Sequence, residues 1–224
     1  LQMEHLQLMR DANEQITRAT SWGQITKTIC QQARMVLQAP LAMLWPYDSS
    51  NEQFLPLRGA ADGLNSQTWK TLQGDPARVQ HAFQLAFVQG GQACDDLQEI
   101  DELLDPAFRE FVELTGARSF LSVPLQRGNE RLAVLWVGYH ESRCLHTGLL
   151  ERAKDFAASA AQELQKIDLI EQLGNANRTT NLIAQVRLID NLDQTLRTAG
   201  ERIMQHFKAD VVSIHCYDPH QARF

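Results

Sequence analysis

Apolar residues recur along this chain with two spacings, and each spacing predicts a different kind of element. The apolar runs Ser119–Leu125 and Leu132–Tyr139 flank the polar residues 127–130. Short apolar runs bounded by turn residues are typical of buried strands, and Gly128 and Asn129 tolerate the positive φ of a tight turn. We therefore predict a central β-hairpin over residues 119–139.

Segments on both sides of this hairpin have apolar residues every three to four positions, which is typical of amphipathic helices. Asp105 before Pro106 predicts the start of one helix, and Gly116 predicts its end. Further short runs that end in turn residues predict additional strands. The predicted helices cover residues 1–19, 22–36, 66–72, 76–89, 106–114 and 147–173, and the predicted strands cover 41–47, 53–57 and 92–94.

The first and last of these helices have partial heptads. Leu6, Met9, Asn13 and Ile16 alternate spacings of three and four, which is the pattern of a coiled-coil seam with one polar break. The exit helix runs on through residues 169–190 without a proline. We therefore expect a homodimer that forms through the N-terminal and exit helices.

Part of the chain repeats at a shift of 170 residues. Residues 24–54 align without a gap onto 194–224, with Gln, Thr, Ala, Tyr-Asp and the closing Phe identical. A coincidence of two helix–strand units is the less favoured alternative. We predict an N-terminal signalling helix (1–19), a complete domain (20–168), a connecting helix (169–190), and the first helix and strand of a second, incomplete copy (191–224). Its isolated strand, 211–217, should pair with another chain or be poorly ordered.

Composition excludes several classes of function. The chain has 21 Lys and Arg against 27 Asp and Glu, a net charge of −6, and no basic stripe that would bind nucleic acid or an anionic membrane. Its longest apolar run has six residues, whereas a bilayer span needs about twenty. The four cysteines are scattered, which indicates a reducing compartment. We expect a cytoplasmic module, either free or as part of a membrane-anchored parent.

The order helix, hairpin, variable helices, SFLSVPL, GNERLAVLWVGY and long exit helix resembles the GAF domain of signalling proteins. The resemblance covers residues 20–170 fully and 190–224 as a truncated copy. It implies an α/β fold of the α+β type, with an antiparallel sheet that has helices on both faces. It also implies a ligand pocket under the variable helices and a non-catalytic sensory role that relays a signal to an output domain. A sensor histidine kinase is the parent that this resemblance favours. A cyclic-nucleotide enzyme, a transcription regulator and a ligand-free dimerisation scaffold are the alternatives.

Subfamily signatures narrow the chemistry. Bilin-binding members resemble one another in a Cys-His pair before the SFLSVPL-type strand, and residues 105–116 contain neither residue. The Asn-Lys…Phe…Asp-Glu pattern of cyclic-nucleotide binders does not occur here. The cysteine of the methionine sulfoxide reductases is missing from residues 114–117, which removes that nucleophile. We predict no cofactor and no catalytic residue, disfavour a bilin, and leave haem or another small ligand open.

Two groups of residues are candidates for a ligand pocket. Asp95 and Asp96 would accept from a ligand amine or hydroxyl, although a solvated acidic loop is the interpretation that we favour. Arg109 would bind an anionic ligand, or would pair with Asp105 one helical turn away. The remaining candidates line a pocket or fill the core: Trp69, Phe108, Ser119 and Trp136.

One cluster carries side chains that bind metals. His140, Cys144 and His146 lie close together in the sequence, but no fourth ligand follows at a typical spacing. We therefore predict no metal site.

Overall fold

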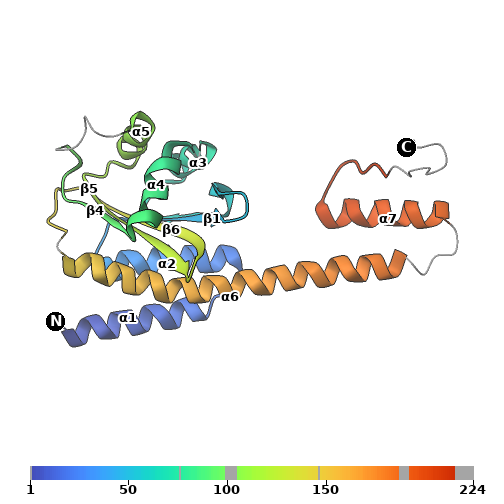
Figure 1. The fold of residues 1–224 in the computed structure, drawn as a ribbon, viewed down its shortest axis with the longest axis horizontal. Coiled ribbons are helices and arrows are strands. Elements are labelled where there is room, and N and C mark those ends of the chain that lie inside the picture. Colours follow the sequence, from blue (N-terminus) through green and yellow to red (C-terminus); the bar gives the residue numbers. More distant parts are fainter. Residues whose placement is uncertain (1, 76, 99–104, 146, 187–191, 215–224) are drawn as a thin grey trace. The chain divides into compact units, whose positions relative to one another are not determined.

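The computed structural model describes every residue except 1, 76, 99–104, 146, 187–191 and 215–224. Its contacts divide the chain into two compact units, Leu1–Asp168 and Leu169–Phe224. The first unit contains the sheet and most of the helices (Figure 1).

The centre of the first unit is an antiparallel sheet in the order β2-β1-β6-β5-β4, with β3 also paired to β1. The predicted hairpin forms its middle, because β5 and β6 pair along nearly their whole lengths. The strands are β1 (Leu41–Asp48), β2 (Gln53–Phe54), β3 (Ala60–Asp62), β4 (Gln92–Cys94), β5 (Ser119–Arg127) and β6 (Glu130–Tyr139).

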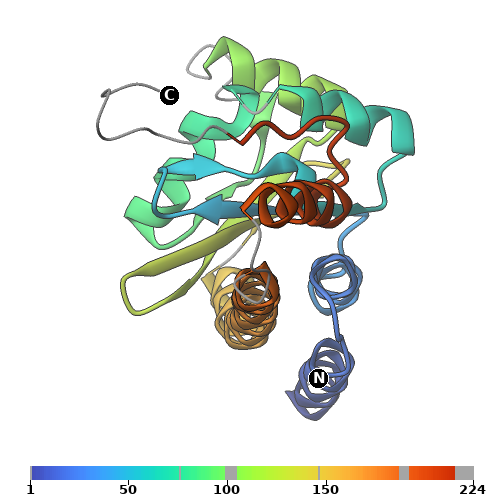
Figure 2. The ribbon, with the colours of Figure 1, turned by 90° about the vertical axis from the view of Figure 1, so that its right-hand side faces the viewer.

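Helices cover both faces of this sheet, as the resemblance implied (Figures 1 and 2). One face packs against α1 (Gln2–Thr17), α2 (Trp22–Leu37) and the first part of α6 (Thr147–Val186). The other face packs against α3 (Ser66–Gly74), α4 (Ala77–Gln89) and α5 (Pro106–Thr115). The fold is therefore mixed α/β with a GAF-type arrangement of layers.

Alternation along the strands separates two hydrophobic cores. In β1, Ala42 and Leu44 face the core under α1, α2 and α6, whereas Met43 and Trp45 face the core under α3, α4 and α5. Successive strand side chains point to opposite faces, so a strand buried on both sides reads as a continuous apolar run. This is why the hairpin carries no polar alternation.

The helix ends agree with the sequence signals. Asp105 accepts a hydrogen bond from the Ala107 N–H at 2.9 Å and caps α5, and Pro106 occupies the first turn. Gly116 ends α5 with φ 63°, a left-handed conformation that suits glycine.

Three features correct the sequence prediction. Strand β3 was not predicted, because Ala60 and Ala61 carry no strand signal; it is held by pairing to β1 and by the ion pair of Asp62 with Arg34. The return strand predicted over 53–57 ends at Phe54, and the short 3-10 helix η1 (Pro56–Arg58) follows, since Pro56 has no N–H for a strand ladder.

The strand predicted over 211–217 is not seen where the structure describes it. Residues 211–214 form no strand, and 215–217 lie outside the described residues. A strand requires a partner, and the sequence from 191 onward contains one strand pattern only.

The predicted seam of α1 is partly covered within the chain. Ala12 and Ile16 are buried in the core shared with α2 and α6. Asn13, the polar break of the seam, accepts a hydrogen bond from the Ser159 hydroxyl on α6 at 2.7 Å.

The second unit contains α7 (Leu192–Phe207), which has 16 residues, as α2 does. Both helices end with the same backbone geometry. Gln38 and Lys208, which are 208 − 38 = 170 positions apart, have φ values of 50° and 52°. One residue further on, the Ala39 N–H donates to the Arg34 carbonyl at 2.9 Å and the Ala209 N–H donates to the Met204 carbonyl at 3.0 Å.

Candidate functional site

The face of the sheet under α3, α4 and α5 is unusually rich in aromatic rings. Trp45 on β1 contacts Trp69 of α3 and Phe83 of α4, with ring centroids 5.2 and 5.8 Å apart. Trp136 on β6 contacts Phe111 of α5 at 5.1 Å. These side chains, with Tyr47, Phe54, Phe87, Phe108 and Phe120, form what we call the aromatic face.

Strand register places the main groups of this face beside one another. Ser122 on β5 lies directly opposite Trp136 on β6. Trp136 in turn lies opposite Met43, two residues before Trp45 on the same side of β1. Side chains opposite or diagonal on one face are within reach of each other. Ser122 and the two indoles are therefore neighbours on the floor under α4 and α5.

Gly138 makes room for the Trp136 ring. A Cβ at position 138 would lie 2.3 Å from Cη2 and 2.5 Å from Cζ3 of that indole. No real Cβ tolerates such a distance, so the glycine allows Trp136 to lie flat along its own strand.

Three polar atoms on this floor have no hydrogen-bond partner among the described residues. They are the indole nitrogens of Trp45 and Trp136 and the hydroxyl oxygen of Ser122. Both indoles are fully buried, and Ser122 is 1% exposed. A buried polar group without a partner costs about 1–3 kcal/mol, so native proteins retain few of them.

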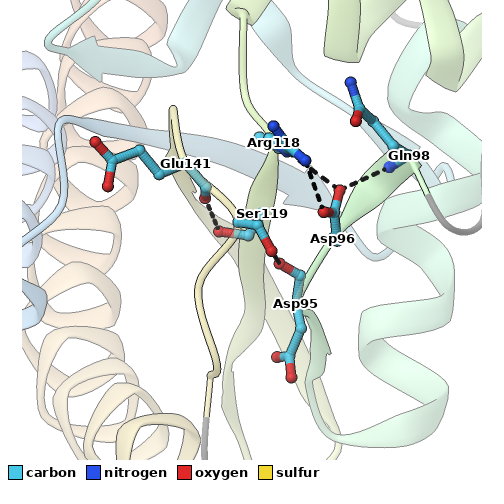
Figure 3. Close-up of polar contacts among 7 residues, drawn as sticks. Asp95, Asp96, Gln98, Arg118, Ser119 and Glu141 are labelled. Atoms are coloured by element: carbon cyan, nitrogen blue, oxygen red, sulfur yellow. Dashed lines mark hydrogen bonds and ion pairs between the residues drawn. The ribbon is translucent and has the colours of Figure 1, made fainter.

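The carboxylates of Asp95 and Asp96 lie at one end of the sheet, in contacts with the protein itself (Figure 3). Arg118 donates to both oxygens of Asp96, from Nη2 at 3.1 Å and from Nε at 3.4 Å. The Gln98 N–H adds a third hydrogen bond at 3.0 Å. Hydrogen bonding to Arg118 is the main cause that lowers the pKa of Asp96 below its usual range.

Asp95 and Ser119 join the sheet to the segment that leads into α6. The Leu145 N–H donates to the Asp95 carboxylate at 2.8 Å, and the Arg143 N–H donates to the Asp95 carbonyl at 3.0 Å. The Ser119 hydroxyl donates to the Glu141 carbonyl at 2.8 Å (Figure 3). We call these contacts, with the Asp96–Arg118 pair, the polar clasp.

The structure divides the predicted site residues into two groups. Trp69, Phe108 and Trp136 belong to or pack against the aromatic face. Asp95, Asp96 and Ser119 belong to the polar clasp, so sequence spacing did not bring them to the aromatic floor. Arg109 lies half-buried on α5, where its N–H donates to the Asp105 carbonyl at 2.9 Å.

Two of the three residues of the metal-ligand cluster are described. His140 places Nδ1 3.0 Å from the Gly116 carbonyl, and Cys144 is an exposed free thiol. His146 lies outside the described residues. Over the described part of the chain, no three His, Cys, Asp or Glu side chains gather as a metal site would require.

Two open hollows indent the surface of the first unit away from the aromatic floor. One, of about 480 Å³, lies at the hairpin end of the sheet beside Tyr47, Glu52 and Arg131. The other, of about 470 Å³, lies between Gln38 and the segment from Tyr139 to Arg143, where the Arg143 guanidinium donates to the Gln38 carbonyl at 3.3 Å. Neither holds a predicted site residue.

Sequence reasoning missed four residues of the aromatic face. Trp45, Phe83, Phe111 and Ser122 were assigned to elements but not to the site. Alternation from Trp136 across the hairpin would have placed Ser122 beside it, and a lone hydroxyl in a run of apolar residues is a usable signal. No signal in the sequence shows that a helix ring will meet a particular strand ring.

The described helices include none that is both long enough and apolar enough to span a bilayer.

Comparison with known proteins gives a likeness of structure alone. No family model matches the chain, and no curated protein matches it. A GAF domain from a phosphoenolpyruvate-protein phosphotransferase of Coxiella burnetii matches with a TM-score of 0.58 at 19% identity, over 76% of this chain and 98% of that one.

Two light-sensing proteins are also similar in structure. The bacteriophytochrome RpBphP3 of R. palustris matches with a TM-score of 0.62 at 12% identity, over 92% of this chain and 46% of that one. A far-red absorbing dark state with bound biliverdin IXa, JSC1_58120g3, matches with a TM-score of 0.54 at 14% identity, over 72% of this chain and 99% of that one. This chain has the fold of GAF domains.

Proposed function

We propose that this chain is a non-catalytic sensory module of a signal-transduction protein. A small ligand or a partner binds the first unit on its aromatic face, and the resulting change in helix packing passes through α6 to an output domain. GAF domains among the structural neighbours support a sensory role. The proposal includes a second, incomplete copy of the domain over residues 191–224.

The observation that carries this proposal is that one set of strands contacts both the aromatic face and α6. Trp136 faces the rings of α5, while its neighbours Leu135 and Val137 face the core that contains α6. A ligand that shifts β6 therefore also shifts the surface on which α6 packs. Two sets of polar contacts strengthen the link to α6.

The first of these is the polar clasp, which holds the segment before α6. The second lies at the hairpin tip, where Arg127 donates to the Gln165 side chain at 2.7 Å and Gln165 donates to Glu130. Both ends of the sheet are therefore attached to one helix of 40 residues. Rigid helices that move as units are an established way to carry a two-state change.

We propose a sensor histidine kinase as the parent, by analogy with the signalling proteins that this fold serves. We also propose that the module acts as a homodimer through its N-terminal and exit helices. Leu8 on α1 and Ile170 and Leu173 on α6 support this, because they are 42%, 54% and 64% exposed.

A ligand-free dimerisation scaffold is the second candidate. The packing of the aromatic face favours it, because Phe83 and Phe111 contact each other at 5.7 Å and bridge the two buried indoles. A floor filled by its own side chains needs no ligand to exclude water.

Native mass spectrometry and amide hydrogen exchange separate the two candidates. The 224-residue chain is purified without denaturant and compared with the same chain after unfolding, dialysis and refolding. A sensory module shows a mass above that of the 25.4 kDa polypeptide before stripping, and slower exchange of residues 147–168 in the loaded form. Equal mass and equal exchange in both preparations would contradict sensing and favour the scaffold.

A further inference from the structure

We propose that the ligand of the aromatic face is a small, planar molecule with hydrogen-bond acceptors, held by the indole N–H groups of Trp45 and Trp136 and the hydroxyl of Ser122. This inference rests on the proposed sensory function and names the chemical class that the site takes.

The polar groups of the floor determine the need for acceptors. An indole nitrogen carries a hydrogen that it can only donate, and a serine hydroxyl donates as well as accepts. All three atoms are buried without a partner among the described residues. A carbonyl or ring nitrogen placed over Trp136 and Ser122, which lie directly opposite each other, would satisfy both groups.

The rings around these groups determine the shape. Between Trp45 and Trp136 the ring contacts run through Phe83 and Phe111, with centroids 5.8, 5.7 and 5.1 Å apart along the path. A flat aromatic molecule that displaces one phenyl ring exchanges ring–ring contacts for similar ones and adds the missing hydrogen bonds. An aliphatic molecule would lose the edge-to-face contacts.

The charged side chains at the end of the sheet favour a neutral ligand. Asp96 is paired with Arg118, and the Asp95 carboxylate accepts from the Leu145 N–H. Both belong to the polar clasp and do not serve the floor. An ionised ligand would therefore be desolvated among rings without compensation from these groups.

Two probes of equal shape test the proposal. Coumarin is a neutral two-ring molecule with carbonyl and ring-oxygen acceptors, and naphthalene has the same flat two-ring form with none. Each is titrated into the full chain carrying ¹⁵N-labelled tryptophan, and the four indole N–H resonances are followed. Trp22 is an internal reference, because it lies on α2 and its indole already donates to the Arg58 carbonyl at 2.8 Å.

We expect coumarin to move the Trp45 and Trp136 resonances downfield and to leave Trp22 in place. Two neutral hydrogen bonds should make coumarin bind about tenfold more tightly than naphthalene. Ser122→Ala should weaken coumarin about threefold and leave naphthalene unchanged. Trp22→Phe, the matched control for Trp45→Phe and Trp136→Phe, should change neither affinity.

Several results would overturn the proposal. They are the absence of shifts at millimolar coumarin, equal affinity for the two probes, and unchanged affinity in Ser122→Ala when its spectrum shows a folded chain. If a substituted tryptophan unfolds the protein, the two probes on the unsubstituted chain still decide.

Exchange along α6 distinguishes this inference from the function on which it rests. Coumarin binding without a change in residues 147–168 would leave the site standing and contradict the relay. Loaded and stripped chains that differ along α6, with no coumarin binding, would support sensing and contradict the acceptor site.

Discussion

Asp96 shows how a single carboxylate at the end of the sheet contributes to stability. Its pKa is lowered, chiefly by the hydrogen bonds from Arg118. A depressed folded-state pKa means that the contribution is present above the unfolded value of about 3.9 and is lost as the pH falls through the folded value.

We therefore expect Asp96→Asn to lower the urea midpoint at pH 7, and the difference from the unsubstituted chain to shrink as the pH falls below 4. Urea unfolding at pH 7, 5 and 3 measures this. Asp155→Asn, on an exposed position of α6, is the control and should change little. A midpoint difference for Asp96→Asn that stays constant down to pH 3 would contradict the role of its ionised form.

At the same scale, the sequence predicted which residues are aromatic core but not which polar atoms the core strands. Trp136 was a candidate because it stands in a strongly apolar strand. Whether its N–H has a partner depends on Ser122 opposite and on rings from α5, and these meet only through pairing across the sheet. Likewise, Asp95 and Asp96 read as a solvated loop because Arg118 lies 22 residues away from Asp96.

Among elements, those with local signals could be predicted, and those held by tertiary contacts could not. Helix α5 carries its start in Asp105-Pro106 and its end in Gly116, so its bounds followed from the sequence. Strand β3 has no such signal, since Ala60–Asp62 contains no β-branched or aromatic residue. It exists because β1 presents an edge and because Arg34 on α2 pairs with Asp62.

The C-terminus of α2 offers a direct test of element geometry. Gln38 ends the helix with φ 50°, a conformation that strains residues with a Cβ and suits glycine. We expect Gln38→Gly to raise the free energy of unfolding by about 0.5–1 kcal/mol.

The matched control is Gln31→Gly, at an exposed position inside the same helix, which should lower it by about 1 kcal/mol. Chemical denaturation of both variants measures the difference. A loss of stability in Gln38→Gly would show that the left-handed conformation is not the one populated in solution. Lys208, with φ 52° at the end of α7, has the same geometry, which supports the proposed second copy.

At the scale of the whole molecule, the separation of two cores by one sheet makes a sensory module physically reasonable. The core under α3, α4 and α5 contains the aromatic floor, and the other contains α1, α2 and α6. A ligand on one side can therefore change helix packing on the other only by moving shared strands. Its energy must come from a difference in affinity for two packing arrangements.

The proposed dimer is the property of the whole molecule that is most open to test. Ile170, Leu173 and Asn177 follow one another at spacings of three and four, and β-branched, Leu and Asn side chains at such positions favour paired parallel helices. Ile170 and Leu173 are largely exposed in the single chain, so replacing them should not remove packing within it.

We expect the double variant Ile170→Glu/Leu173→Glu to be monomeric at tens of micromolar, where the unsubstituted 224-residue chain is dimeric by sedimentation equilibrium. Four like charges along one seam would repel at short range, while the thermal midpoint of the first unit should stay within a few degrees. Leu57→Glu is the control, because Leu57 is 86% exposed on η1 and lies outside the heptads. It should leave the dimer intact. An unsubstituted chain that is a strict monomer at high micromolar concentration would contradict the dimer, and a double variant that remains dimeric would place the interface away from this seam of α6.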